Sequence, residues 1–244
     1  MKAWERKYLA IAPFLLPVHQ WVLGQLRKHT DGGRNTLLDV GGRKSHYTVG
    51  LDTVVVVTDL FRRSSVQKEL RLGFGQVTLD HLQTNRSNIL GVMVDDMTAS
   101  SIASASIDIV VAVEVLEHVP DDDAFVGEIR RVLKPDGVFV MTTPNGDWVP
   151  NTNPDHVRHY RRSELTELLE ASFQSVAVKH GIVGGFTHRW GLASWSLSSP
   201  FETARGMTSN LVNAWLSRVS SSPKCRHLLA TASLPIRSGA QSAS

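Results

Sequence analysis

Cysteine is nearly missing from this sequence, because Cys225 is the only one among 244 residues. A single cysteine excludes an internal disulfide framework and a cysteine-rich metal site, and we expect no bound metal. Proteins kept in a reducing compartment do not depend on disulfides for their stability. The low cysteine content therefore favours a cytoplasmic location.

Neither sign of charge is in marked excess. The 26 Lys and Arg residues stand against 23 Asp and Glu residues, which gives a formal net charge of +3. No long basic run is present, and such a run is the usual mark of a nucleic-acid-binding protein, so we expect no nucleic-acid partner. Internal repeats are also missing. With 42% hydrophobic side chains, the chain is long enough to bury the core of one domain.

Long apolar runs are lacking as well. The apolar stretch 8–16 follows three basic residues and imitates a signal peptide, but Pro13 and Pro17 interrupt it. Such a broken stretch is too short to span a bilayer. We expect residues 1–30 to form a helical flap packed on the domain, with peripheral contact to a membrane surface as the alternative.

Short apolar runs alternate with polar or helical stretches along most of the chain. This alternation is typical of βαβ units and of a parallel sheet buried on both faces. Pro120 precedes a helix whose apolar residues share one face, and Ser163 is expected to cap another. The expected strands are 36–40, 53–58, 90–94, 107–113, 138–142, 175–178 and 227–232.

The domain organisation follows from this pattern. We expect one domain over 31–237, with a cofactor half at 36–145 and an acceptor-side loop at 146–160. Residues 181–225 contain many glycines and serines and three tryptophans, and they predict an insertion before the last strand, helical from 209 to 219. The remaining residues, 238–244, are expected to be a flexible tail.

Glycines and carboxylates follow the first two expected strands. Asp39, Gly41 and Gly42 end the first strand, where an α/β sheet binds a nucleotide-type ligand and glycine lets backbone amides approach it. Asp59 comes twenty residues later, the spacing at which a carboxylate can accept hydrogen bonds from a ribose diol. The alternative is a tight turn followed by a solvated strand end.

Five segments together resemble a known family. They read LLDVGG, VVVVTDL, DDM, IDIVVAVEVLEHV and RRVLKPDGVFVMTTPN, in this order between residues 36 and 145. Their order and spacing resemble the motifs of class I S-adenosylmethionine-dependent methyltransferases, in the branch that includes the ubiquinone and menaquinone biosynthesis methyltransferases. The resemblance covers roughly residues 36–180. It implies a Rossmann-like α/β fold with a seven-stranded sheet and S-adenosylmethionine as the cofactor.

The resemblance also implies which residues hold the methionine and ribose parts of the cofactor. Asp39, Gly41 and Gly42 would cradle the methionine part, and Asp59 would hold the ribose hydroxyls. Arg43 departs from the family pattern, which commonly has a further glycine at this position. Its guanidinium would either pair with the cofactor carboxylate or face water.

The adenine side is implied in the same way. Leu60 would flank the ring, Asp96 would accept a hydrogen bond from its amino group, and Met97 would line it. Glu114 and Val115 would close the site at the fourth strand. All these positions follow carboxyl ends of parallel strands, where open α/β sheets bind their ligands.

Histidines supply the candidate catalytic groups. Methyl transfer from a sulfonium is an in-line displacement that depends on alignment, and a hydroxyl acceptor also needs a base. His118 would lie near the mouth of the site. After the fifth strand, His156 is the first candidate for the base, with His159 and Tyr160 in reserve. The alternative is that these histidines only fix the loop to Glu117 or Asp155.

The sequence thus predicts a methyltransferase acting on a small organic, lipid-like or glycan-linked acceptor, at oxygen. One alternative is a catalytically silent protein that only binds S-adenosylmethionine. Another is an NAD(P)-dependent oxidoreductase, which shares the doubly wound sheet. The oxidoreductase is disfavoured because no GxGxxG follows the first strand and Arg43 would fill the room that a pyrophosphate needs.

Overall fold

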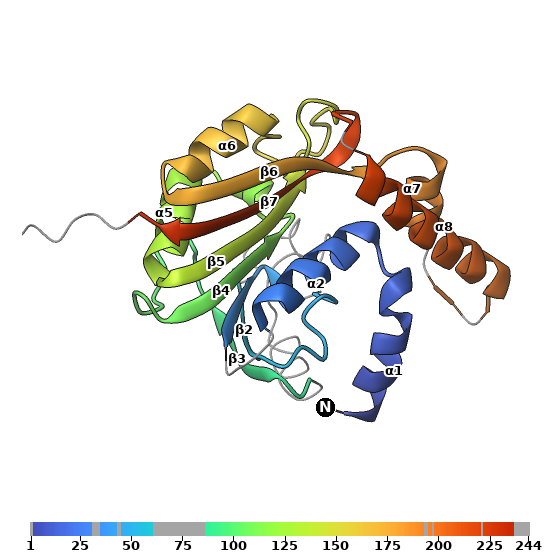
Figure 1. Cartoon of the computed structure of the whole chain (residues 1–244), viewed down its shortest axis with the longest axis horizontal. Coiled ribbons are helices and arrows are strands. Elements are labelled where there is room, and N and C mark those ends of the chain that lie inside the picture. Colours follow the sequence, from blue (N-terminus) through green and yellow to red (C-terminus); the bar gives the residue numbers. More distant parts are fainter. Residues whose placement is uncertain are drawn as a thin grey trace, which may run out of the picture.

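The computed structural model shows a twisted sheet with helices on both faces and a helical arm at one end (Figure 1). Arg43 and the expected tail 238–244 lie outside the residues that the structure describes. The described residues are 2–30, 35–42, 45–60, 86–192, 195–196, 198–220 and 222–236.

The sheet has seven strands in the order β3-β2-β1-β4-β5-β7-β6. Neighbours from β3 to β5 are parallel, whereas β7 runs antiparallel to both β5 and β6. The expected Rossmann-like seven-stranded fold is therefore confirmed. The strands are β1 Thr36–Val40, β2 Val54–Asp59, β3 Ile89–Val94, β4 Ile107–Val113, β5 Leu133–Pro144, β6 Phe173–Val183 and β7 Cys225–Pro235.

The last three strands are longer than the sequence predicts. Pro135 and Gly137 predict a break before β5, but the strand already begins at Leu133. Ile107 of β4 pairs with Leu133, and Ile109 pairs with Val138. The four residues between Leu133 and Val138 therefore form a bulge within β5 and do not end the strand. Pairing with β4 thus overrides the local turn composition.

Two helices cover one face of the sheet. The helix α5 (Asp122–Val132) begins as predicted, and the Asp121 carboxylate accepts a hydrogen bond from the Ala124 amide at 3.0 Å. The helix α6 (Arg162–Glu170) starts at Arg162, so the predicted Ser163 cap is wrong. The Glu164 carboxylate instead accepts from the Arg161 amide at 2.8 Å. Apolar residues of both helices pack with β4, β5 and β7 in one core cluster.

The N-terminal helices cover the opposite face. The chain forms α1 (Ala3–Ile11), the 3-10 turn η1 (Ala12–Phe14) and α2 (Pro17–Thr30). Apolar side chains of α2 join a second core cluster with residues of β1, β2 and β4. Among the described residues, no single helix is long and apolar enough to cross a membrane, and these two helices meet that test only as a pair bent by 116°.

Two further helices, α7 (Phe186–Gly191) and α8 (Pro200–Val219), come between β6 and β7 in the sequence. They project beyond the end of the sheet (Figure 1). The helix α8 begins nine residues before the predicted start at 209, with Pro200 in its first turn. Asn210 joins α8 to the N-terminal segment by donating to the Phe14 carbonyl at 3.0 Å. These contacts bring α7, α8 and α2 together over the carboxyl ends of the strands.

Candidate active site

Asp39 is buried at the carboxyl end of β1. Its carboxylate accepts hydrogen bonds from the Tyr47 hydroxyl at 3.1 Å and, more weakly, from the Thr48 hydroxyl at 3.4 Å. Burial raises the pKa of Asp39 to about 6, although the hydrogen bond from Ser45, the nearby Arg86 guanidinium and the hydrogen bonds from Tyr47 and Thr48 oppose this shift. A carboxylate this poorly solvated gains much from a cationic partner.

Gly41 and Gly42 fit closely around this carboxylate. Gly41 has a φ of +70°, and its amide donates to the Thr58 carbonyl at 2.7 Å. A Cβ at Gly41 would lie 2.8 Å from Cγ2 of Val115, and a Cβ at Gly42 would lie 2.2 Å from Cγ of Asp39. Both positions therefore require glycine, because a side chain would displace the loop from Asp39.

The ends of β2 and β3 carry the residues implied for the nucleoside. The Asp59 carboxylate accepts from the Leu60 amide at 2.8 Å, and Leu60 is exposed. Asp96 is exposed as well and accepts from the amide and hydroxyl of Thr98 at 3.0 and 2.7 Å. Met97 is buried among the core residues under α5. The four implied residues lie at neighbouring strand ends but line neither of the two cavities described next.

Glu114 ends β4 in an unusual backbone conformation. Its φ of +53° is rare for a residue other than glycine and is typical of functional sites. The carboxylate accepts a hydrogen bond from the Thr142 hydroxyl at 2.8 Å, and its other oxygen lies 3.5 Å from Nε2 of His227. Burial raises the pKa of Glu114 toward neutral pH.

Two cavities meet at Glu114. The first has a volume of about 510 Å³ and extends from Glu114 over Gly41 and Tyr47 toward α1. The second has a volume of about 390 Å³ and extends from Glu114 toward the loop after β5 and toward β7. Both are lined by Leu16, His19, Glu114 and Leu192.

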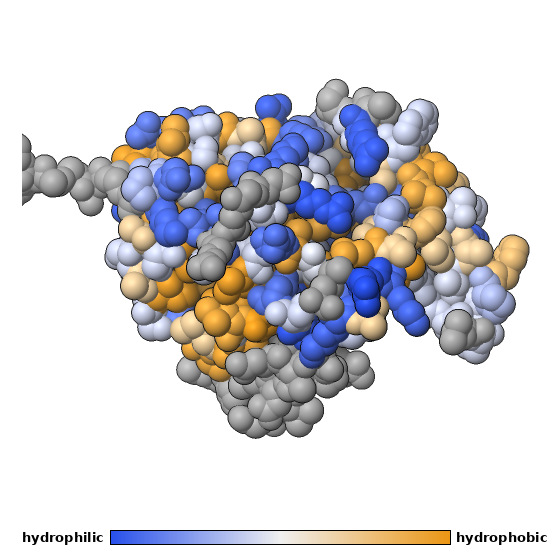
Figure 2. Space-filling view, turned by 60° about the horizontal axis from the view of Figure 1, so that its bottom comes forward, coloured by the Kyte–Doolittle hydropathy of each residue, from blue (hydrophilic) through white to orange (hydrophobic). Residues whose placement is uncertain are grey.

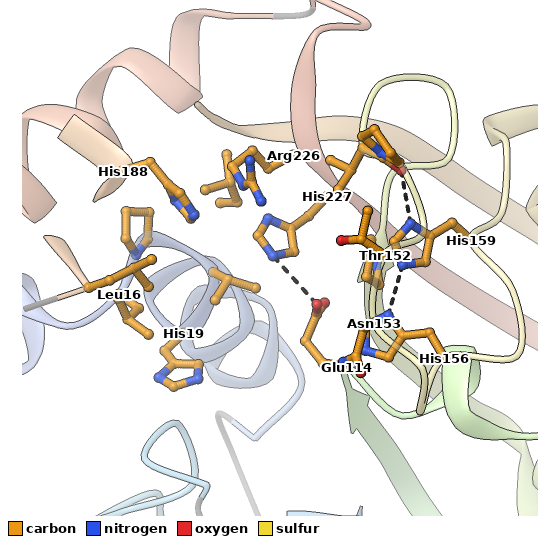
Figure 3. A pocket seen from close by; sticks show the side chains of 17 residues that line it. Leu16, His19, Glu114, Thr152, Asn153, His156, His159, His188, Arg226 and His227 are labelled. Atoms are coloured by element: carbon orange, nitrogen blue, oxygen red, sulfur yellow. Dashed lines mark hydrogen bonds and ion pairs between the residues drawn. The ribbon is translucent and has the colours of Figure 1, made fainter. Parts of the chain in front are cut away.

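The loop after β5 presents histidines to the second cavity (Figure 3). Nδ1 of His159 lies 2.9 Å from the Val149 carbonyl oxygen, and Nε2 of His159 lies 2.8 Å from Nδ1 of His156. The His118 ring contacts His156 edge to face, with 4.6 Å between ring centroids. Burial lowers the pKa of His156 to about 4, so its ring is neutral at pH 7.

Tyr160 is placed differently from the three histidines. Its side chain is buried, and its hydroxyl donates to the Asp122 carboxylate at 2.7 Å. Arg158 holds the same carboxylate at 2.5 Å. These contacts tie the histidine loop to the start of α5, whereas Tyr160 lines neither cavity.

Residues 38–141 match the family model described as a methyltransferase domain. A probable S-adenosylmethionine-dependent methyltransferase of Mycolicibacterium smegmatis is 32% identical over 136 residues, which are 53% of this chain and 50% of that protein. A ubiquinone biosynthesis O-methyltransferase of Idiomarina loihiensis is 29% identical over 182 residues, 66% of this chain and 70% of that protein. The solved structure of YcgJ from Bacillus subtilis superposes with a TM-score of 0.53 at 15% identity, covering 90% of this chain and 100% of that one.

These matches support a class I S-adenosylmethionine-dependent methyltransferase. The motifs that carry the resemblance in the sequence lie in and beside the matched segment. The chain matches the first two curated relatives over 50% and 42% of their length, about half of each protein. The cofactor of this family is S-adenosylmethionine.

Four polar residues line the second cavity although the sequence analysis does not place them there: His19, His188, Arg226 and His227. Burial lowers the pKa of the three histidines to about 4. They come from α2, α7 and β7, so no local motif unites them. The one available signal was the total of 10 histidines in the chain.

Proposed function

We propose that this chain is an S-adenosylmethionine-dependent methyltransferase that acts on a hydroxyl oxygen of a small organic acceptor. The observation that carries the proposal is the pair of cavities that meet at Glu114. One cavity begins at the glycine loop beside Asp39, and the other is lined by histidines. A donor and an acceptor bound in adjoining cavities would be held in line, which accounts for much of the rate of such a displacement.

The cofactor would bind at the carboxyl ends of β1 to β4. A buried carboxylate beneath a loop that has no room for a Cβ fits the charged methionine end of S-adenosylmethionine. We assign this end to Asp39, Gly41 and Gly42, and the closing wall to Glu114 and Val115.

The nucleoside part would extend toward β2 and β3. We assign the ribose to Asp59 and the adenine to Leu60, Asp96 and the backbone of Met97, whose side chain lies in the core. The carboxylates of Asp59 and Asp96 follow neighbouring parallel strands, as in other nucleotide sites of open α/β sheets.

The chemistry requires a proton acceptor beside the transferred methyl group. When bound, S-adenosylmethionine supplies a methyl group on a sulfonium. We assign the proton acceptor to Glu114, which lines both cavities, and the contact with the acceptor to His156, whose ring is oriented by His159. Glu114 would take the hydroxyl proton of the acceptor, and the bound sulfonium would supply the methyl group that the acceptor oxygen receives. The products are a methyl ether and S-adenosylhomocysteine.

The lining of the second cavity supports a small acceptor with an apolar body. Leu16, Val18 and Ile182 provide apolar contacts, and the histidines provide polar ones. A cavity of about 390 Å³ suits a small organic molecule or the head of a lipid-like one. The names of several relatives, ubiquinone biosynthesis O-methyltransferases, point in the same direction.

The test is methyl transfer from labelled S-adenosylmethionine to a panel of phenols, lipid extracts, glycolipids, RNA and protein. We expect label in a phenol or lipid fraction, and His156→Ala should lower that turnover while the affinity for S-adenosylhomocysteine stays unchanged. Label in RNA or protein alone would contradict the proposed acceptor class. Cofactor binding without transfer to any fraction would instead indicate a catalytically silent binding protein.

Exposed apolar side chains support a second proposal, that the acceptor is reached from a membrane surface. Such side chains gather on the end formed by α7 and α8 (Figure 2), where Phe201 and Trp215 are 78% and 62% exposed. The last turn of the same helix carries Arg218, which favours anionic lipid, whereas Arg205 is paired with Glu202. Sedimentation with anionic vesicles should be lost in a Phe201→Ser, Trp215→Ser variant. Equal sedimentation of the variant would rule this surface out.

A further inference from the structure

Three side chains beside the second cavity converge on one point. Glu117 and His118 belong to the short turn η3 (Leu116–His118) after β4, and His156 lies on the loop after β5. One possible ligand atom from each of the three lies within 4.8 Å of the other two. Backbone hydrogen bonds from Val157 and Arg158 to the Glu117 carbonyl hold the two segments together, at 2.7 and 3.5 Å.

The Glu117 carboxylate has an unused oxygen. The side chain is buried, at 1% exposure, and Oε2 accepts a hydrogen bond from the Thr143 hydroxyl at 3.0 Å. Oε1 has no hydrogen-bond partner among the residues that the structure describes. A buried carboxylate oxygen without a donor or a cation is unfavourable, so this oxygen is available to a cation.

The hydrogen bonds of the histidines leave one nitrogen of each available. Nδ1 of His118 lies 2.9 Å from the Asp155 carbonyl oxygen, which can only accept, so this nitrogen carries the proton and Nε2 keeps its lone pair.

His156 is oriented by a relay of the same kind. The Val149 carbonyl accepts from Nδ1 of His159, which leaves Nε2 of His159 to accept from Nδ1 of His156. Nε2 of His156 therefore also keeps its lone pair. Metal-ligating histidines are typically oriented by donating their other N–H to a carbonyl or a similar acceptor.

We propose that Glu117, His118 and His156 bind a divalent first-row transition-metal ion, with Zn²⁺ as the first choice, beside the acceptor cavity. Two imidazole nitrogens and one carboxylate oxygen form a ligand set that suits Zn²⁺ better than Mg²⁺ or Ca²⁺. Three protein ligands leave at least one coordination position open, as in catalytic zinc sites. This proposal departs from the sequence analysis, which expects no metal.

The role of the ion rests on the proposed function. His156 lines the second cavity, so the open position would face the acceptor. An acceptor hydroxyl bound there would lose its proton more readily, because a divalent ion lowers the pKa of an oxygen it holds. Glu114 would remain the proton acceptor, and His156 would act as a ligand.

Metal binding can be measured without any acceptor. The full chain, treated with a chelator and dialysed against Zn²⁺, should retain one ion per chain, and Co²⁺ in its place should give the absorption of a protein-bound ion. Glu117→Gln and His118→Ala should each weaken binding by about 100-fold or more. His188→Ala is the matched control, because it removes a histidine of the same cavity outside the cluster, and it should bind the ion like the unchanged chain.

The outcomes separate this proposal from the proposed function. Failure to retain Zn²⁺ or Co²⁺ in a chain that still binds S-adenosylhomocysteine would overturn the metal site and leave the methyltransferase function standing. An equal loss of metal binding in His188→Ala would show that the ion binds loosely to many histidines. It would also overturn the proposed metal site. If Glu117→Gln unfolds, His156→Asn decides, since it changes a half-buried ligand on a loop. Loss of S-adenosylhomocysteine binding in the unchanged chain would count against the proposed function instead.

Discussion

The two cavities that meet at Glu114 are built in different ways. The first is formed around one short segment, 39–48, whose loop encloses Asp39, and His19, Glu114 and Asn210 add polar groups from other elements. The second takes its polar groups from α2, the loop after β5, α7 and β7, which lie far apart in the sequence. A site made by one loop depends on each of its residues, whereas a site made by four elements depends on how those elements pack. The two cavities should therefore respond differently to substitution.

Substitution of Glu114 gives the largest expected effect, because this residue belongs to both cavities. Glu114→Gln keeps the shape but removes the proton acceptor, and turnover should fall by about 10²- to 10⁴-fold. The affinity for S-adenosylhomocysteine, measured by calorimetry, should change by about threefold or less. Glu167→Gln, an exposed substitution on α6, is the control and should change neither quantity. A parallel loss of cofactor affinity in Glu114→Gln would mean that Glu114 acts by holding the cofactor and not as the proton acceptor.

Asp39→Asn should act on the first cavity alone. Removing the charge should weaken cofactor binding by about 10- to 100-fold, the usual effect of losing one hydrogen bond to a charged group. Because the pKa of Asp39 is raised to about 6, the affinity of the unchanged chain should fall as the pH drops below about 6, where the carboxyl takes up a proton.

Asp39→Asn should remove the pH dependence of the cofactor affinity. In the cofactor-free chain the sign is opposite: a raised carboxyl pKa means that the folded state binds more protons, so the free energy of unfolding should rise as the pH falls through about 6. Titration calorimetry and chemical unfolding between pH 5 and pH 8 measure both effects. Asp123→Asn, at an exposed position of α5, is the control. A pH dependence that survives in Asp39→Asn would assign it to another group.

The same contrast explains which parts of the molecule could be predicted. The strands β1 and β4 have the bounds expected from the sequence, because each is a continuous apolar run buried on both faces. The enclosure of Asp39 by Gly41 and Gly42 could also be predicted from the sequence, since all three residues belong to one strand end. Here sequence neighbours are also neighbours in space.

The second cavity could be predicted from the sequence only in part. His156 and His159 were found because they share one loop, but His19 and His227 come from opposite ends of the chain. They meet because β7 returns antiparallel beside β5 while α2 covers the same strand ends, and no local pattern encodes that arrangement. Glu117 was seen only as an anchor for a histidine, because its burial becomes evident only in three dimensions.

Asn213→Ala should give the smallest effect and tests how far the second cavity depends on packing. Its side-chain amide is buried and donates to the Val183 carbonyl at 2.7 Å, which fixes α8 against the end of β6. Leaving that carbonyl without a donor should lower the free energy of unfolding by about 1–2 kcal/mol, measured by urea unfolding.

The control is Thr166→Ala, which removes an exposed hydrogen bond on α6 and should lower the free energy of unfolding by about 0.5 kcal/mol or less. Asn213 itself lines neither cavity, although Asn210 of the same helix lines the first one, so the affinity for S-adenosylhomocysteine should change little while turnover falls. Loss of cofactor affinity in Asn213→Ala would mean that the two cavities are not independent and that the packing of α8 also shapes the loop around Asp39.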